Sequence, residues 1–352
     1  MDDMDDVWRE DDTTPARVEA ALRHLFAVRH KEERAYVPAR VMNMVVVVDA
    51  EFRGEIENRL ERVGRYHPSR LVICAVEPRR TKLSARATIG TRDAPAAGAI
   101  AVGRERVELL LGERHLPTLD TIVDPLLVSD LATMVWSPHG YPAAIDALRE
   151  RAQIALLDSL DEPDVRASLA RSSSLAEDMY LVDLAWLRST PWRERVAATF
   201  DPPARRPELF AIDRVTVRHR DDSLASALLF FGWLSSRLGW RPDQLANVKG
   251  RWSGHATTRR QDIKLRLESV DQNAPGLAGV TIETSSGQTI SLDRSPGGLK
   301  AQRRERDGRE LGWTMMGASR GEGGILGEGV RQALLRDPTY RPALAFAQRM
   351  VG

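Results

Sequence analysis

The chain contains two short runs of consecutive apolar residues, at Met44–Val48 and Leu71–Val76. Apolar residues that are continuous rather than alternating are typical of strands buried on both faces of a parallel sheet. The segment between the runs, residues 51–65, carries apolar side chains at helical spacing, namely Phe52, Ile56, Leu60 and Val63. The pattern therefore predicts a right-handed β–α–β unit, in which the helix packs on the two strands.

Shorter segments with alternating apolar and polar residues follow at Leu83–Thr91, Gly98–Val102 and Arg106–Leu111. We interpret them as an antiparallel extension of the same sheet. A further apolar run at Leu131–Trp136 predicts another buried strand. The fold class expected for residues 14–172 is therefore an N-terminal α/β domain with a Rossmann-like mixed sheet.

The second half of the chain has a different pattern. Residues 175–200 are predicted to be one long helical region interrupted near Pro191, and Ser223–Leu238 an apolar helix. Between Val248 and Arg306, apolar and polar residues alternate, and turns containing Gly and Pro separate the segments. The fold class expected for residues 173–352 is an α+β C-terminal domain, an antiparallel sheet with flanking helices.

Composition narrows the possible classes of protein. With 42% hydrophobic and 29% charged residues, the chain resembles a folded soluble protein. Its apolar runs are too short to span a membrane and no secretory leader pattern opens it, so we expect a cytoplasmic location and no membrane partner. The single cysteine, Cys74, excludes an internal disulfide. Residues 1–12 carry six Asp and one Glu, which predicts a disordered acidic arm over residues 1–13.

Motifs of catalysis and nucleotide binding are weak or missing. The segment 317–321 matches G-x-S-x-G, but α/β-hydrolases place the catalytic histidine after the serine, and the last histidine here is His255. A glycine-rich loop is the favoured interpretation. No Gly-Lys pair is present for a P-loop. The turn after the first buried strand contains Asp49 and Glu51, whose carboxylates would repel a pyrophosphate at a helix N-terminus.

Metal and nucleic-acid sites are also disfavoured. The seven histidines occur singly, without an H-x-x-x-H pair. Asp120 and Asp124 are four residues apart, and helix solubility explains them better than acid–base catalysis. Between Lys249 and Arg309, 12 basic residues exceed 7 acidic ones, but Trp252 is the single aromatic residue of that stretch. We therefore expect no catalytic residue, cofactor, metal or nucleic-acid partner.

Five segments of the chain are similar to one known family, namely Arg40–Asp49, Tyr66–Cys74, Asp124–Trp136, Asp183–Trp192 and Asp337–Tyr340. Together they resemble the OpcA family, the glucose-6-phosphate dehydrogenase assembly proteins. The resemblance extends from about Ala21 to the final helices. It implies a non-catalytic partner and allosteric activator that binds glucose-6-phosphate dehydrogenase and supports NADPH production in the oxidative pentose phosphate pathway.

Two of these segments supply candidates for partner binding. In the turn at His67, Ser69 and Arg70, the side chains could orient toward an anion or a carboxylate of a partner. The alternative is local: the turn ends a helix, and Arg70 pairs with a nearby acid. Trp186 and Arg188 belong to residue types that are enriched in protein–protein hot spots, although core packing also explains them.

A different class of protein stays open as the alternative. The chain would then be an α/β enzyme or sensor that binds a sugar phosphate or nucleotide through an unrecognised site. That class predicts a deep pocket in which polar groups converge.

Overall fold

The computed structural model of the protein describes residues 6–32, 36–37, 40–63, 69–91, 101–139, 141–316 and 322–352. The chain divides into two compact units. Unit 1 comprises Met1–Leu157, Asp178–Val182 and Gly329–Leu335, and unit 2 comprises Asp158–Glu177, Asp183–Glu328 and Arg336–Gly352. The chain passes between the units more than once, so the division is not a single cut in the sequence.

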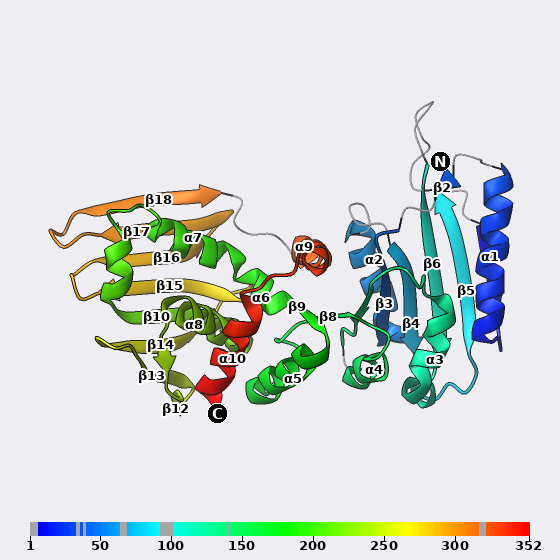
Figure 1. The fold of residues 1–352 in the computed structure, drawn as a ribbon, viewed down its shortest axis with the longest axis horizontal. Coiled ribbons are helices and arrows are strands. Elements are labelled where there is room, and N and C mark those ends of the chain that lie inside the picture. Colours follow the sequence, from blue (N-terminus) through cyan, green and yellow to red (C-terminus); the bar gives the residue numbers. More distant parts are fainter. Residues whose placement is uncertain are drawn as a thin grey trace. The chain divides into compact units, whose positions relative to one another are not determined.

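Unit 1 is built on a nine-stranded sheet (Figure 1). In spatial order its strands are β1 (Asp6–Glu10), β5 (Ser84–Thr91), β6 (Ala101–Leu111), β4 (Ser69–Val76), β3 (Met42–Asp49), β7 (Thr133–Trp136), β8 (Ile154–Leu157) and β9 (Tyr180–Asp183), while β2 (Tyr36–Val37) pairs with β6. Strands β6, β4, β3, β7 and β8 are parallel, and β5 and β1 continue the sheet in antiparallel orientation. The helices are α1 (Pro15–Glu32), α2 (Arg53–Val63), α3 (Leu119–Val123) and α4 (Pro142–Ala147).

The predicted β–α–β unit is present in this sheet. Strands β3 and β4 pair in parallel register, with Val46 opposite Ile73, and α2 connects them. Every residue from Val45 to Val48 is fully buried. The continuous apolar run thus corresponds to a strand that is covered on both faces of the sheet. The protein is a mixed α/β protein with two sheets, as the sequence predicts.

The predicted disordered arm is wrong for Asp6–Glu10, which form strand β1. Trp8 lies opposite Ala87 of β5, and the Thr13 amide donates to the carbonyl of Leu83 at 2.9 Å. Cations of neighbouring segments neutralise the acidic side chains, because Arg29 lies 3.7 Å from Asp6 and Lys82 pairs with Asp12. A high local charge therefore does not prevent order where oppositely charged groups from elsewhere in the fold meet it.

Unit 2 contains the second nine-stranded sheet. In spatial order its strands are β11 (Arg241–Pro242), β13 (Arg251–Thr257), β14 (Asp262–Val270), β10 (Ile212–Arg220), β15 (Leu277–Thr284), β16 (Thr289–Ser295), β17 (Gly298–Arg304) and β18 (Glu310–Met316), while β12 (Ala246–Val248) pairs with β13. All neighbours are antiparallel except β10 and β14, which are parallel. Helices α7 (Thr190–Phe200), α8 (Leu224–Leu238) and α10 (Tyr340–Val351) lie on one side of this sheet (Figure 1).

The region predicted as a long helical stretch interrupted near Pro191, residues 175–200, is broken at that point and also earlier. Helix α5 (Val165–Asp178) ends first, β9 follows, and α6 (Leu184–Arg188) and α7 come after it. The Tyr180 amide donates to the carbonyl of Gln153 at 2.9 Å, which draws this segment into the first sheet. The predicted domain boundary at residues 172 and 173 falls inside α5. The last long helix, α9, covers Glu322–Leu335.

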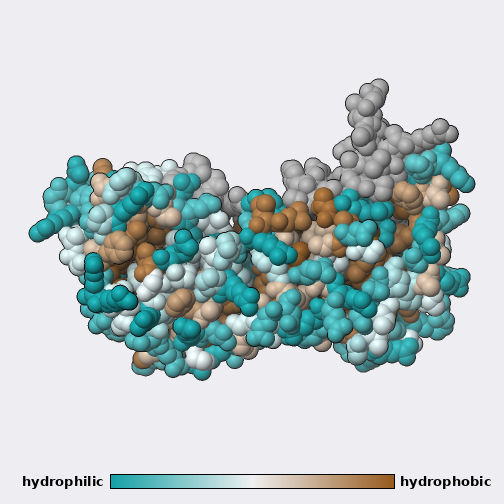
Figure 2. Space-filling model, in the orientation of Figure 1, coloured by the Kyte–Doolittle hydropathy of each residue, from teal (hydrophilic) through white to brown (hydrophobic). Residues whose placement is uncertain are grey.

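Polar side chains cover most of the surface seen in Figure 2, and apolar groups gather in smaller areas between them. Within the described part of the chain, no helix combines the length and the apolar character that crossing a membrane requires.

Candidate functional site

The carboxyl end of the parallel strands in unit 1 is the first place to look for a ligand site. Ligands of open α/β sheets bind at the topological switch point, where the connections that follow two neighbouring strands leave in opposite directions. Strand β3 is flanked by β4 on one side and by β7 on the other. That switch point therefore lies between the segment after Asp49 and the segment after Trp136.

Side chains of the protein itself interact across this switch point. Asp49 caps the short helix that follows β3, accepting from the Glu51 amide at 3.0 Å. The Tyr141 hydroxyl donates to the other carboxylate oxygen of Asp49 at 3.1 Å. The ring of His139 packs on that of Phe52, with 4.6 Å between their centres. Burial first, and then the hydrogen bond to Asp49, raises the pKa of Tyr141 to about 12, so its hydroxyl is a donor at neutral pH.

This arrangement is unlike a phosphate cradle. A cradle presents free backbone amides and a helix N-terminus to the anion, whereas here the Asp49 carboxylate already binds the Glu51 amide. The sequence identified Asp49 and Glu51 but not His139 or Tyr141. The available signal was the break at residues 138–142, directly after a buried strand.

Arg70 lies in a buried ionic cluster at the opposite end of the same strands. Its Nε donates to Glu105 at 2.8 Å and its Nη1 to the carbonyl of Leu126 at 3.1 Å. Arg40 also binds Glu105, with its Nε at 2.9 Å from Oε2. The side chain of Glu105 is only 2% exposed and that of Arg70 15%. The local alternative for Arg70, pairing with a nearby acid, is the one observed.

Asn43 holds the same loop from the neighbouring strand. Its amide nitrogen donates to the carbonyls of Val128 and Leu131 and to the Thr133 hydroxyl, and its oxygen accepts from the Val128 amide at 3.0 Å. Asn43 is completely buried. Together with Arg70 it fastens the segment 126–133 to the amino ends of β3 and β4. Three of the family-like segments therefore meet in one place.

The remaining two family-like segments meet inside unit 2. Asp183 caps α6, accepting from the Ala185 amide at 2.9 Å, and also accepts from the Ser159 hydroxyl at 2.6 Å. The Tyr340 hydroxyl donates to the same carboxylate at 3.1 Å. Burial, with a contribution from the charge of Asp158, raises the pKa of Asp183 to about 6.

Trp186 and Arg188 belong to this second cluster. Trp186 is 2% exposed, and its indole donates to Asp337 at 2.8 Å, while the Arg193 guanidinium stacks on its ring. Arg188 makes a two-pronged pair with Asp158, at 2.8 and 2.6 Å, and its side chain is 7% exposed. Neither residue offers an exposed anchor on the surface of unit 2.

The other predicted positions are placed as follows. Ser69 is the first residue of β4 and is half-buried, and His67 lies outside the described residues, as does the G-x-S-x-G segment. Asp120 lies in α3, whereas Asp124 begins a separate short turn and lies 3.3 Å from Arg151. Cys74 is fully buried, which raises the pKa of its thiol to about 12. Among the residues described, no three His, Cys, Asp or Glu side chains form a group suited to a metal.

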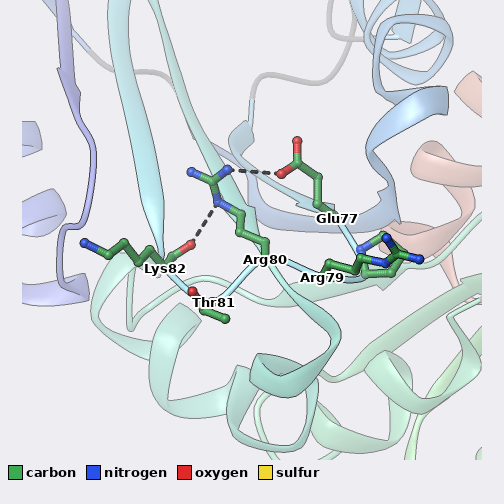
Figure 3. Close-up of a pocket in the computed structure, with 6 residues that line it drawn as sticks. Glu77, Arg79, Arg80, Thr81 and Lys82 are labelled. Atoms are coloured by element: carbon green, nitrogen blue, oxygen red, sulfur yellow. Dashed lines mark hydrogen bonds and ion pairs between the residues drawn. The ribbon is translucent and has the colours of Figure 1, made fainter.

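A basic loop lines a cavity of about 610 Å³ at the end of β4 (Figure 3). The loop covers residues 77–82 and carries Arg79, Arg80 and Lys82. Arg80 is tied down internally, because it donates to Glu77 at 3.0 Å and to the carbonyl of Lys82 at 2.9 Å. A single loop supplies the whole lining, so polar groups from separate elements do not converge as in a built ligand site.

The fold and these clusters define a two-sheet α/β protein whose switch point is bridged by its own side chains. Residues 60–174 match the family model described as glucose-6-phosphate dehydrogenase subunit N-terminal domain, and residues 179–344 match the corresponding C-terminal domain. The chain belongs to the OpcA family of glucose-6-phosphate dehydrogenase assembly proteins.

Curated relatives agree with this placement, and one solved structure is similar in fold alone. The chain is 31% identical over 182 residues to the OxPP cycle protein OpcA of Synechococcus elongatus, and 29% identical over 181 residues to that of Nostoc punctiforme. These matches cover 51% and 50% of this chain but 40% and 38% of the relatives. The transcriptional regulator Gal80p of Kluyveromyces lactis is similar in fold, with a TM-score of 0.50, 6% identity, and coverage of 90% of this chain and 89% of that one.

Proposed function

We propose that this protein is a non-catalytic partner of glucose-6-phosphate dehydrogenase that promotes the enzyme's active state in the oxidative pentose phosphate pathway. The observation that carries the proposal is the bridged switch point of unit 1. A dehydrogenase of this fold would use that position for the cofactor's pyrophosphate. Here the capping carboxylate of Asp49, held by Tyr141, occupies the Glu51 amide, which an anion at this position would need.

The mechanism proposed is a shift of population. A protein that binds the active form of an enzyme more tightly than the inactive form raises the share of the active form. No chemical step on this chain is required. The names of the matched models, which describe subunit domains of the dehydrogenase, support the choice of partner.

Partner contact at His67, Ser69, Arg70, Trp186 and Arg188 stays a prediction. For the last three, the internal hydrogen bonds support a positioning role, in which they hold the family-like segments in place. We propose that these clusters keep the two units rigid enough to present a fixed docking surface elsewhere.

A steady-state assay tests the proposal. The dehydrogenase of the same organism is measured with and without equimolar chain, over a range of glucose 6-phosphate concentrations. We expect a higher rate or a lower KM in the mixture, and no NADP reduction by the chain alone. Unchanged kinetics together with no detectable complex would refute the partnership, and cofactor reduction by the chain alone would revive the enzyme alternative.

Cofactor binding gives a second readout. We expect no quenching of tryptophan fluorescence by NADP, and the Asp49→Gly variant tests whether the cap is the obstacle. Tight NADP binding by the unaltered chain would contradict the proposal that the Asp49 cap keeps a pyrophosphate from the switch point.

A further inference from the structure

The second sheet has one face that no described helix covers, and its composition is unusual. We propose that this face is where the dehydrogenase docks, and that it recognises an acidic surface on that enzyme. The inference rests on the proposed function and adds the location and the chemistry of the contact.

The face is defined by three rows of residues. Each row runs across the sheet through neighbouring strands, which in spatial order are β13, β14, β10, β15, β16, β17 and β18. The central row is Ser253, Arg266, Thr216, Thr281, Ser291, Gln302 and Gly312. The row on one side is His255, Lys264, Arg214, Glu283, Thr289, Arg304 and Glu310, and the row on the other side is Glu268, Arg218, Gly279, Asp293, Lys300 and Thr314. We call these twenty positions the open face; every one is polar, charged or glycine.

The opposite side of the same strands is apolar. In β14 the residues Ile263, Leu265 and Leu267 are at most 2% exposed, while Lys264 and Arg266 between them are exposed. Side chains alternate across a strand, so the first set faces the helices and the second set faces away. Figure 1 draws α7, α8 and α10 on one side of this sheet, and the buried apolar side chains belong to that side.

The side chains of the open face are held in place by contacts with one another. Arg218 reaches across β15 to Asp293 at 2.8 Å and also donates to Thr281 at 3.0 Å. Gly279 permits this, because a Cβ at that position would lie 2.4 Å from Nη2 of Arg218. The Thr281 and Ser291 hydroxyls are 2.9 Å apart. Side chains that are already fixed lose little conformational entropy when a partner docks.

The open face is about half the size of a standard contact. Seven strands about 4.8 Å apart span roughly 29 Å, and three rows two residues apart span roughly 14 Å along the strands. The product is about 400 Å², against the roughly 800 Å² that each partner contributes to a standard protein–protein interface, so the open face would form one part of a larger contact.

The charge distribution indicates an acidic partner. The four acids of the open face each lie near an arginine, with Arg214–Glu283 at 3.0 Å, Arg218–Asp293 at 2.8 Å, Arg266–Glu268 at 3.8 Å and Arg304–Glu310 at 4.0 Å. Lys264 and Lys300 remain, both exposed, and neither has an ion pair with the described residues. They lie four strands apart across the sheet and four residues apart along the strands, roughly 24 Å in all. Two carboxylates at that spacing would complement them.

A second copy of the chain is a poorer occupant. The six bases and four acids leave each open face with a net charge of +2, counted over the three rows. Arg251 and Asp262, at the strand ends, cancel each other. Two such faces brought together would place like charges opposite one another, which disfavours association.

The experiment measures the affinity of the full chain for the dehydrogenase by surface plasmon resonance at low and moderate salt. The double variant Lys264→Glu/Lys300→Glu reverses the two lysines, and Gln302→Trp adds bulk without charge. The matched control is Lys31→Glu/Arg341→Glu, which makes the same charge change at exposed positions of α1 and α10. Thermal denaturation checks that every variant is folded.

We expect each open-face variant to weaken binding at least tenfold, and the control to change it less than threefold. Binding by the unaltered chain that both open-face variants retain would overturn the location while leaving the partnership intact. No binding by the unaltered chain would instead refute the proposed function. Sedimentation of the chain alone gives the remaining outcome, because a dimer that the open-face variants abolish, with dehydrogenase binding retained, would assign the face to self-association.

Discussion

The two sheets of this protein differ in whether one or both of their faces are buried. In β3, residues 42–48 are all buried, so the sheet of unit 1 is covered on both sides at that strand. In β14, buried and exposed residues alternate from 262 to 267, so the sheet of unit 2 is covered on one side. A sheet covered on both faces offers mainly its ends to a ligand, and in unit 1 internal clusters occupy both ends at β3. The sheet of unit 2 has a whole face to offer.

The comparison predicts the largest effect for a charge placed in the covered sheet. Val46→Asp buries an unpaired carboxylate at a position with no exposure, and we expect the free energy of unfolding to fall by more than about 4 kcal/mol. The control Arg266→Asp, on the open face, is expected to change it by about 0.5 kcal/mol or less. Urea titrations of both variants measure the difference. Similar losses for the two would mean that the faces are not distinct.

Asn43→Ala tests the cluster that closes the amino end of the first sheet. The change leaves the Val128 amide and the Leu131 carbonyl without Asn43 as their buried partner, whereas the Val128 carbonyl still accepts from the Leu131 amide. We expect a loss of about 2–3 kcal/mol, since each buried group left unsatisfied is costly. Ser291→Ala removes one hydrogen bond on the open face and is expected to cost about 1 kcal/mol or less. Chemical denaturation followed by tryptophan fluorescence ranks them, and an equal cost would contradict the contrast.

Asp183 predicts a pH dependence. Because its folded pKa of about 6 is above the ordinary 3.8, folding favours the protonated form, and the stability from this group is lost as the pH rises from about 4 through 6. Asp183→Asn removes that loss. Relative to the unaltered chain, the variant should gain up to about 3 kcal/mol between pH 4 and pH 7.

Asp337→Asn is the control with the opposite sign. Burial alone would raise the pKa of Asp337, but hydrogen bonds from Thr339 and Trp186 and the charge of Arg193 lower it below its ordinary value. Its contribution is therefore present above pH 4 and lost as the pH falls. Melting temperatures between pH 4 and pH 7 should diverge for the two variants. Parallel curves would show that the pKa of Asp183 is not raised in the folded protein.

The smallest effect is expected at Gly279. The atoms nearest to a Cβ would be the ends of the Arg218 and Asp293 side chains, and these can move. Gly279→Ala should thus change the free energy of unfolding by less than about 1 kcal/mol, while Gly112→Ala meets the Arg80 carbonyl at 1.9 Å and should cost more. Differential scanning calorimetry measures both. A large loss at Gly279 would mean that the Arg218–Asp293 pair supports the fold and not merely the surface.

Local sequence pattern determined much of this protein. Continuous apolar runs identified β3 and β4, and alternation identified β14 and β15, because burial on one or both faces leaves a direct periodic trace in the chain. The carboxylates at 49 and 51 predict that this turn does not bind a phosphate, and that stays a prediction. The resemblance of five segments indicated the family, which the matched domain models confirm.

Only the tertiary structure decided what the singled-out residues do. Arg70, Trp186 and Arg188 are of the types that anchor interfaces, but Glu105, Asp337 and Asp158 reach them from 35, 151 and 30 residues away, and no local pattern encodes such distant partners. The same reason applies to β1 and β9, whose hydrogen bonds come from distant strands. The open face likewise exists only as a register of seven strands, because residues that form one row are spread from Thr216 to Gly312.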